Sequence, residues 1–237
     1  MKKHKSIFSA ALADAMPIIL AYFPIAMTFG VVATANAMPP WLTIFISICV
    51  YAGGAQFMMI PLIISGVTPL SVIITVMLVN LRHFLYGTTL GPRFSLWPEW
   101  KKWIASFGLT DEVFAVTSSK DHVEPITPSY QFLFVFSCYA SWVAGTIVGV
   151  LVDRAVPTSL SGILSYALPA LFIALLFIGK RTMPYLVAAA FGALCALAAT
   201  WLHMGSMGII AGTLIGATVG AVINQLWISS IHRVNHT

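Results

Sequence analysis

Long apolar runs dominate the chain, and short polar or proline-containing segments separate them. A run of about 20 apolar residues is long enough to cross a bilayer as a helix. The pattern predicts about seven spans, near residues 15–35, 41–65, 69–86, 129–152, 160–178, 183–203 and 204–227. We therefore expect an all-α, polytopic transmembrane bundle that forms one integral membrane domain over residues 1–237. Residues 6–14 are expected to form a short interfacial helix before the first span.

The second predicted span is interrupted by Gly53-Gly54 and again by Pro61. Glycine and proline are the two poorest helix formers. At membrane depth, non-helical backbone is tolerated only where it is buried in protein or lines a cavity. We expect a broken helix at Gly53-Gly54, where free N–H groups at a helix N-terminus would form a site for a carboxylate.

The two halves of the chain show signs of an internal repeat. An offset of about 115 residues aligns glycines, prolines and a Tyr-Ala pair, namely Gly30 with Gly145, Pro69 with Pro184, and Tyr51-Ala52 with Tyr166-Ala167. It also places Gly53-Gly54 opposite Leu168-Pro169, and interrupted spans at matching positions are the best sequence indication of a transport site. The predicted halves are residues 15–93 and 129–203, with an extra span at 204–227. Three spans per half would give inverted topology, but the Lys and Arg residues of the loops do not agree on one orientation.

Residues 91–130 form the one substantial polar region. Within it, residues 103–116 are moderately apolar but too short and too charged for an ordinary span. We expect a re-entrant or buried helix here, with Thr110 as its N-cap. Asp111 and Glu112 would then lie in its first turn, where the helix dipole favours carboxylates.

Composition places the chain firmly among membrane proteins. It is 59% hydrophobic and 8% charged, with a mean hydropathy of +0.93, whereas soluble domains carry about 25% charged residues. The net charge of +5 comes from scattered Lys and Arg, and no basic run is dense enough to suggest nucleic acid. Neither the three cysteines nor any other motif has the spacing of a metal site, a phosphate-binding loop or a nucleophile, so we expect no cofactor and no enzymatic activity.

Polar residues inside the apolar runs are the candidate functional residues, because a polar side chain at lipid depth is costly unless it faces protein or water. We assign substrate binding to residues at the broken helix and at the end of the third span: Tyr51, Gly53, Gly54, Gln56, Phe57, Asn80 and Arg82. We assign proton coupling or ion pairing to four ionisable residues: His83, Asp14, Asp111 and Glu112.

Arg82 and His83 each allow two interpretations. Arg82 stays charged at physiological pH, so it either extends to the membrane surface or pairs with a carboxylate. That carboxylate would belong to the substrate or to one of three acidic residues, Asp14, Asp111 or Glu112. His83 titrates near neutral pH, which suits proton coupling, although a structural role at the end of a span fits as well.

The last predicted span carries glycine at every fourth position from Gly208 to Gly220. Such a stripe of small residues lets helices approach closely. We expect close packing within the subunit or against a partner at this face.

The polar motifs and their order resemble the AzlC-type exporters of branched-chain amino acids (the LIV-E family). The matching segments are Phe23-Pro24-Ile25-Ala26-Met27-Thr28-Phe29-Gly30, Ala52-Gly53-Gly54-Ala55-Gln56-Phe57, Asn80-Leu81-Arg82-His83-Phe84-Leu85-Tyr86-Gly87, Thr110-Asp111-Glu112-Val113-Phe114 and Ala167-Leu168-Pro169-Ala170-Leu171-Phe172. The resemblance implies the large subunit of a two-component secondary transporter in the bacterial inner membrane, with a small AzlD-type partner. It implies export of leucine, isoleucine, valine and similar residues such as methionine, by alternating access and with proton coupling.

The chain departs from that family at one place and leaves other functions open. Relatives have an acidic residue just before the aromatic residue of the Ala167 motif, where this chain reads Leu164-Ser165-Tyr166, so its coupling or substrate differs if that acid has a role. A non-transporting scaffold or regulatory subunit is the alternative, and it would tolerate changes at the polar residues but not at the glycine stripe. A small channel would need a continuous polar lining, which the last four predicted spans lack.

Overall fold

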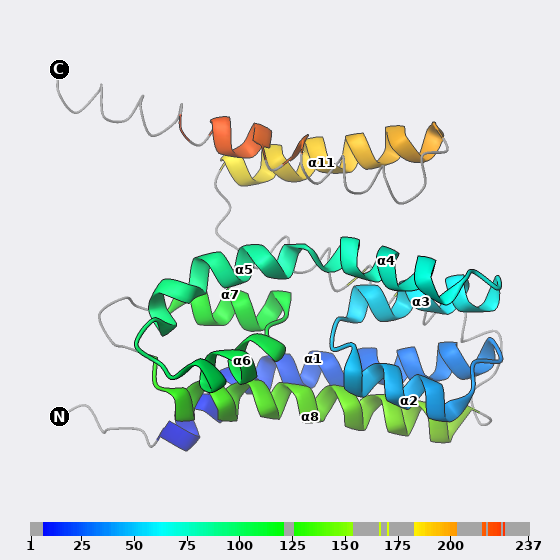
Figure 1. Ribbon diagram of the computed structural model, residues 1–237, viewed down its shortest axis with the longest axis horizontal. Helices are drawn as coiled ribbons and strands as arrows, with labels where there is room; N and C mark the ends of the chain where they lie inside the picture. The colour runs from blue at the N-terminus through cyan, green and yellow to red at the C-terminus, as the bar shows by residue number, and fades with distance from the viewer. Residues whose placement is uncertain are drawn as a thin grey trace. The chain divides into compact units, whose positions relative to one another are not determined.

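Figure 1 shows the computed structural model, which describes residues 7–120, 126–153 and 183–202, together with 166, 170, 215–216, 218–223 and 225. The chain divides into two compact units, residues 1–172 and 173–237, and each is described by itself. The first unit contains α1 (Ile7–Ala35), α2 (Pro40–Cys49), α3 (Gly53–Ile64), α4 (Pro69–Asn80), α5 (Arg82–Leu90), the 3₁₀ helix η1 (Gly91–Phe94), α6 (Glu99–Phe107), α7 (Asp111–Ser119) and α8 (Pro128–Val152). The second unit contains α11 (Met183–Trp201).

Helices α1 and α8 lie side by side and form the centre of the first unit (Figure 1). Glycines make this close approach possible, because a side chain at these positions would meet the backbone of the opposite helix. A Cβ atom on Gly30 would lie 2.5 Å from the Thr146 carbonyl oxygen, and Cβ atoms on Gly145 and Gly149 would clash with the backbone of α1. Gly30 and Gly145, which the sequence offset aligns, therefore both lie at this helix contact, whereas the repeat itself stays a prediction.

The second predicted span does not cross the unit but turns back on itself. Figure 1 shows α2 and α3 as a hairpin of two short antiparallel helices joined by residues 50–52. Met38 and Ile46, around α2, lie in one apolar cluster with Ile60 of α3 and with the C-terminal end of α1, as a hairpin requires. The predicted break at Gly53-Gly54 is confirmed, because α3 begins at Gly53. The predicted second interruption is wrong, because α3 continues through Pro61.

The third predicted span is longer than expected and bends once. Helix α4 ends at Asn80, Leu81 forms a turn, and α5 continues with η1 as far as Phe94. Only Val72 of α4 and Leu90 of α5 are buried. Most of the other side chains of α4 and α5 are therefore partly or fully exposed in the first unit. Large apolar residues such as Met77 and Phe84 are among them.

The polar region forms two short helices, α6 and α7, and not the single helix predicted over residues 103–116. Gly108 ends α6, and Thr110 starts α7 with its side chain accepting a hydrogen bond from the Val113 N–H, as predicted. Arg93 of η1 donates to the carbonyl oxygens of Thr117 and Lys120 at the C-terminal end of α7. With nine residues, or about 14 Å, α7 is too short to cross a bilayer.

Three helices of the described residues are long and apolar enough to cross a membrane: Ile7–Ala35, Pro69–Phe94 and Pro128–Val152. The predicted interfacial helix is wrong, since α1 runs unbroken from Ile7 through Asp14 into the first span. Helix α11 (Met183–Trp201) lies within the span predicted at residues 183–203. The predicted span at 160–178, the Leu168-Pro169 break, Gly208, Gly212 and the N-terminal lysines lie outside the described residues.

Candidate functional site

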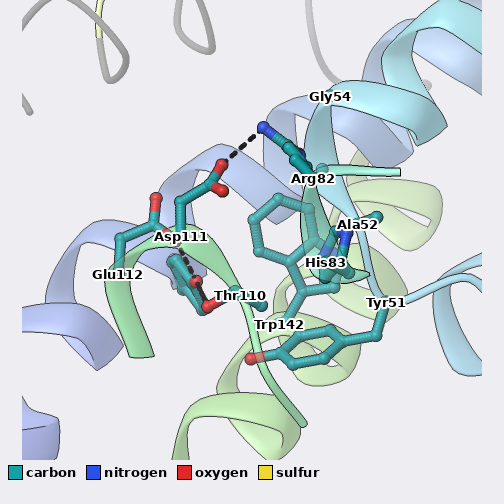
Figure 2. A pocket seen from close by; sticks show the side chains of 11 residues that line it. Tyr51, Ala52, Gly54, Arg82, His83, Thr110, Asp111, Glu112 and Trp142 are labelled. Atoms are coloured by element: carbon teal, nitrogen blue, oxygen red, sulfur yellow. Dashed lines mark hydrogen bonds and ion pairs between the residues drawn. The ribbon is translucent and has the colours of Figure 1, made fainter. Parts of the chain in front are cut away.

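A polar pocket lies where three half-length helices begin. The N-terminal ends of α3, α5 and α7 face it, and Figure 2 shows its side chains at close range. Helix N-termini carry unpaired N–H groups and partial positive charge, so their convergence favours an anion. The pocket is lined by Tyr22, Tyr51, Ala52, Gly53, Gly54, Arg82, His83, Thr110, Asp111, Glu112 and Trp142.

Gln56 holds the tip of the α2–α3 hairpin from within the protein and does not line the pocket. Its side chain is fully buried, its Nε2 donates to the Val50 carbonyl oxygen, and its Oε1 accepts a hydrogen bond of 3.0 Å from the Trp142 indole N–H of α8. The Val50 carbonyl oxygen also accepts a hydrogen bond of 2.8 Å from the Ala52 N–H, so Gln56 adds a second hydrogen bond at the C-terminal end of α2. One helical turn further along α8, Thr146 bonds Ser47 of α2 at 2.8 Å.

We predict that Gln56→Leu destabilises the protein by about 1 to 3 kcal/mol, because it leaves the buried Trp142 indole N–H without its partner and removes one of the two hydrogen bonds to the Val50 carbonyl oxygen. The melting temperature of the purified protein measures this. Gln131→Leu is the matched control: Gln131 of α8 is equally buried, but its Nε2 donates one hydrogen bond of 3.4 Å to the Thr117 hydroxyl, and its Oε1 has no partner among the described residues. Equal loss of stability in the two variants would contradict the role given to Gln56.

Tyr51 brings a buried hydroxyl to the pocket. The residue is 6% exposed, and its hydroxyl has no hydrogen-bond partner among the described residues. Its ring packs edge-on against Tyr22 at 6.3 Å and against Trp142 at 6.4 Å between ring centroids. Because an unsatisfied buried hydroxyl costs free energy, this group points to a ligand that supplies the missing hydrogen bond.

An ion pair joins α5 to α7 across the pocket. Arg82 Nη1 lies 2.6 Å from Asp111 Oδ2, and Tyr86 donates a hydrogen bond to the other oxygen of Asp111 (Figure 2 shows the ion pair). Of the three acidic partners considered for Arg82, the structure selects Asp111. Asp14 lies apart from this pocket, where its Oδ2 accepts hydrogen bonds of 2.6 Å from both Lys120 and Tyr130.

Glu112 differs from its neighbour Asp111 in its partners. Its Oε2 lies 2.5 Å from the Tyr22 hydroxyl, which is also 2.6 Å from the Thr110 hydroxyl. Among the described residues no Lys, Arg or His forms a salt bridge with Glu112. Burial raises the pKa of the Glu112 carboxyl above its ordinary value. The two adjacent carboxyl groups thus meet different environments, because Asp111 pairs with a cation and Glu112 with a hydroxyl group.

The structure brings together most of the predicted site residues. Tyr51, Gly53, Gly54, Arg82, His83, Asp111 and Glu112 all line the pocket. Gln56 supports it from behind, and Phe57 packs against Phe29 at 5.5 Å between ring centroids. Asn80 lies at the α4–α5 bend, where its backbone oxygen is 3.1 Å from His83 Nδ1.

Sequence reasoning missed Tyr22 and Trp142 as pocket residues. Each lies in an apolar run with nothing nearby in sequence to mark it. Tyr22 meets its partners Thr110 and Glu112 across 88 and 90 residues of sequence, and Trp142 meets Gln56 across 86. Their roles follow from the packing of α1 and α8, which no local pattern reports.

The fold and the pocket define a helical membrane protein with a polar site inside its bundle. The family described as AzlC protein matches residues 17–156. The chain is 31% identical to the inner membrane protein YgaZ of Escherichia coli, over 93% of this chain and 91% of YgaZ. It is 34% identical to a membrane protein of Archaeoglobus fulgidus, over 89% of this chain and 93% of that protein. No solved structure matches the chain.

The chain therefore belongs to the AzlC family of membrane proteins. This membership confirms the resemblance found in the sequence and is consistent with a role in transport.

Proposed function

We propose that the chain exports branched-chain or similar apolar amino acids across the bacterial inner membrane. In this proposal it is the large subunit of a two-component secondary transporter, with a small AzlD-type membrane subunit as its partner. The observation that carries the proposal is the pocket, which combines a helix N-terminus, a carboxyl pair and the unsatisfied Tyr51 hydroxyl in one buried place. Half-helix N-termini that face anionic substrate groups are characteristic of secondary transporters.

The charges of the pocket suit a zwitterion. The substrate carboxylate would bind the backbone N–H groups of Gly53 and Gly54 at the start of α3, beside Arg82. The ammonium would face the carboxyl groups of Asp111 and Glu112, and the aromatic rings of Tyr22 and Trp142 would contact the apolar side chain. A binding free energy of about 4 kcal/mol, equivalent to millimolar affinity, would suit an exporter that relieves overload.

Export of labelled leucine, isoleucine, valine and methionine from cells tests the proposal. The assay compares cells that produce this chain alone, the chain with a small AzlD-type subunit, and the subunit alone. We expect efflux to rise when both chains are present. Unchanged efflux of all four amino acids, with both chains detected in the membrane, would contradict the proposed function and favour a scaffold or regulatory subunit.

The environment of Glu112 predicts that substrate binding weakens in acid. A protonated carboxyl cannot pair with the substrate ammonium, so the affinity for L-leucine should fall as the pH decreases through the raised pKa of Glu112, which lies above 4.5. Stability of the unliganded protein should change in the opposite direction. Because the folded-state pKa is the higher one, the contribution of Glu112 is complete below 4.5 and is lost as the pH rises through the folded-state pKa.

Binding of labelled leucine to the purified protein between about pH 5 and pH 8 measures this effect. Glu112→Gln should remove the acid dependence that belongs to this carboxyl, and Glu112→Asp should retain it. His83 lines the same pocket and is ionisable, so the series is repeated in a His83→Gln background. A pH profile that Glu112→Gln leaves unchanged would argue against a direct role for Glu112.

A further inference from the structure

The pocket is closed around a small volume. Its cavity measures about 20 Å³, which is room for about one water molecule. Leucine has nine non-hydrogen atoms and needs several times that space. Any amino acid that binds here must therefore displace side chains or a helix that line the pocket.

Helix α7 is anchored along its whole length. Tyr22 of α1 contacts Thr110 and Glu112 at its N-terminal end, and Asp14 of α1 pairs with Lys120 just beyond its last residue. Asp14 and Tyr22 are eight residues apart, as are Glu112 and Lys120, so both pairs span about 12 Å along their helices. The two antiparallel segments therefore match in length, and Arg93 also donates hydrogen bonds to carbonyl groups at the C-terminal end of α7.

The N-terminal end of α5 is held mainly by what it meets on α7. Leu90 anchors the other end of α5 in the core, while Leu81, Phe84 and Leu85 near the bend are exposed. The contacts that join this end to α7 include the Arg82–Asp111 ion pair, the hydrogen bond from Tyr86 to Asp111, and the stacking of Tyr86 on Phe114 at 4.5 Å between centroids. Asp111 is thus the residue of α7 to which the N-terminal end of α5 is joined.

We propose that the Arg82–Asp111 ion pair is the closed gate of the pocket and that a zwitterion opens it by exchanging partners with both ions. The substrate carboxylate replaces Asp111 on Arg82, and the substrate ammonium replaces Arg82 on Asp111. This inference rests on the proposed function and adds to it a requirement on the substrate, which must carry both a carboxylate and an ammonium group. Each protein charge loses one partner and gains another, so the exchange leaves no charge unpaired.

The exchange requires both charged groups on one molecule. An amine alone would take Asp111 from Arg82 without offering Arg82 a carboxylate in return, and a carboxylate alone would take Arg82 from Asp111 without offering Asp111 a cation in return. Separating a partly buried pair without replacement leaves an uncompensated charge, which is costly. The side chains of Arg82 and Asp111 are 29% and 19% exposed, so water compensates only part of that cost.

Cross-linking of α5 to α7 tests the gate in the full-length protein in lipid nanodiscs. Tyr86→Cys/Phe114→Cys replaces the two stacked rings, in a background where the three native cysteines are replaced. We expect saturating L-leucine to slow disulfide formation by about tenfold or more. An equimolar mixture of 3-methylbutylamine and 4-methylpentanoate, which carries the same groups on separate molecules, should leave the rate unchanged. Ser47→Cys/Thr146→Cys is the control and joins α2 to α8, where the two native hydroxyl oxygens lie 2.8 Å apart. Neither residue lines the pocket, so leucine should not change the rate of this cross-link.

Thermal shifts of the unmodified protein give a second measurement that needs no cysteine variant. L-Leucine should raise the melting temperature, and the amine or the acid alone should bind at least about tenfold more weakly. Either compound binding as tightly as leucine overturns the gate. Leucine that binds without slowing the α5–α7 cross-link also overturns the gate but leaves the proposed function standing. If none of the four amino acids binds, the proposed function fails and the gate fails with it.

Discussion

The Gly149→Leu variant is expected to yield little or no folded protein in the membrane. A Cβ atom at this position would clash with the Met27 carbonyl oxygen and crowd the Met27 Cα, both of which are backbone atoms. Backbone atoms cannot rotate away as a side chain can, so α1 and α8 would have to separate. Because these two helices form the centre of the first unit, we expect a loss of about 3 kcal/mol or more.

The yield of monodisperse protein after extraction and the melting temperature of that protein measure this effect. Gly87→Ala is the matched control, because a Cβ atom on Gly87 of α5 would meet nothing within 4 Å. It should express and melt like the parent, or slightly better, since alanine favours helices over glycine. A Gly149→Leu protein that melts within about two degrees of the parent would show that α1 and α8 do not depend on this close approach.

Arg82→Gln should lower export by about 100-fold or more without a matching loss of protein in the membrane. The substitution removes the cation that pairs with Asp111 and that would bind the substrate carboxylate. A 100-fold loss corresponds to about 2.7 kcal/mol, which is within the range for a charged partner in a partly buried pair. Arg82→Lys should recover only part of the rate, because lysine cannot form two parallel bonds to a carboxylate.

Two further variants separate charge from position. Lys102→Gln breaks the exposed pair with Glu99, and export should be unchanged because surface ion pairs contribute little. Arg82→Asp/Asp111→Arg should restore the ion pair and the amount of protein but not export, since the charges then face the wrong ends of the substrate. Full export by Arg82→Gln at normal protein level would remove Arg82 from the mechanism.

The fold class and several helix boundaries could be read from local sequence because hydrophobicity and caps act over short distances. The apolar windows located α8 to within one residue of its start, and Gly53-Gly54 marked the beginning of α3. Pro61 misled because a helix surrounded by apolar neighbours tolerates proline, as α1 also does at Pro17 and Pro24. Whether two half-length helices continue across the membrane or turn back depends on what they pack against, which a window of sequence cannot show.

The sequence predicted those site residues whose charged side chains cost free energy at lipid depth. It missed the site residues whose side chains are compatible with an apolar run. Arg82 and Asp111 each need a partner at depth, so their pairing could be proposed from the sequence among three alternatives. Asp14 found a different partner because Lys120 and Tyr130 come within reach only after α1, α7 and α8 assemble. Tyr22 and Trp142 are unremarkable in an apolar run, and their hydrogen bonds exist only in the folded protein.

The turn of the α2–α3 hairpin also determines which compartment the polar region faces. Because the hairpin leaves the membrane on the side where it enters, α4 and α5 bring the chain back to the side on which α1 began (Figure 1). Arg93, Lys101, Lys102 and Lys120 then lie on the side where α1 begins, and Lys2, Lys3 and Lys5 directly precede α1 in the sequence, so a hairpin avoids the conflict that a full crossing at residues 41–65 would create. Positive residues accumulate on the cytoplasmic side, so a reporter enzyme fused after Lys102 should be active in the cytoplasm, and activity in the periplasm would show that this assignment is inverted.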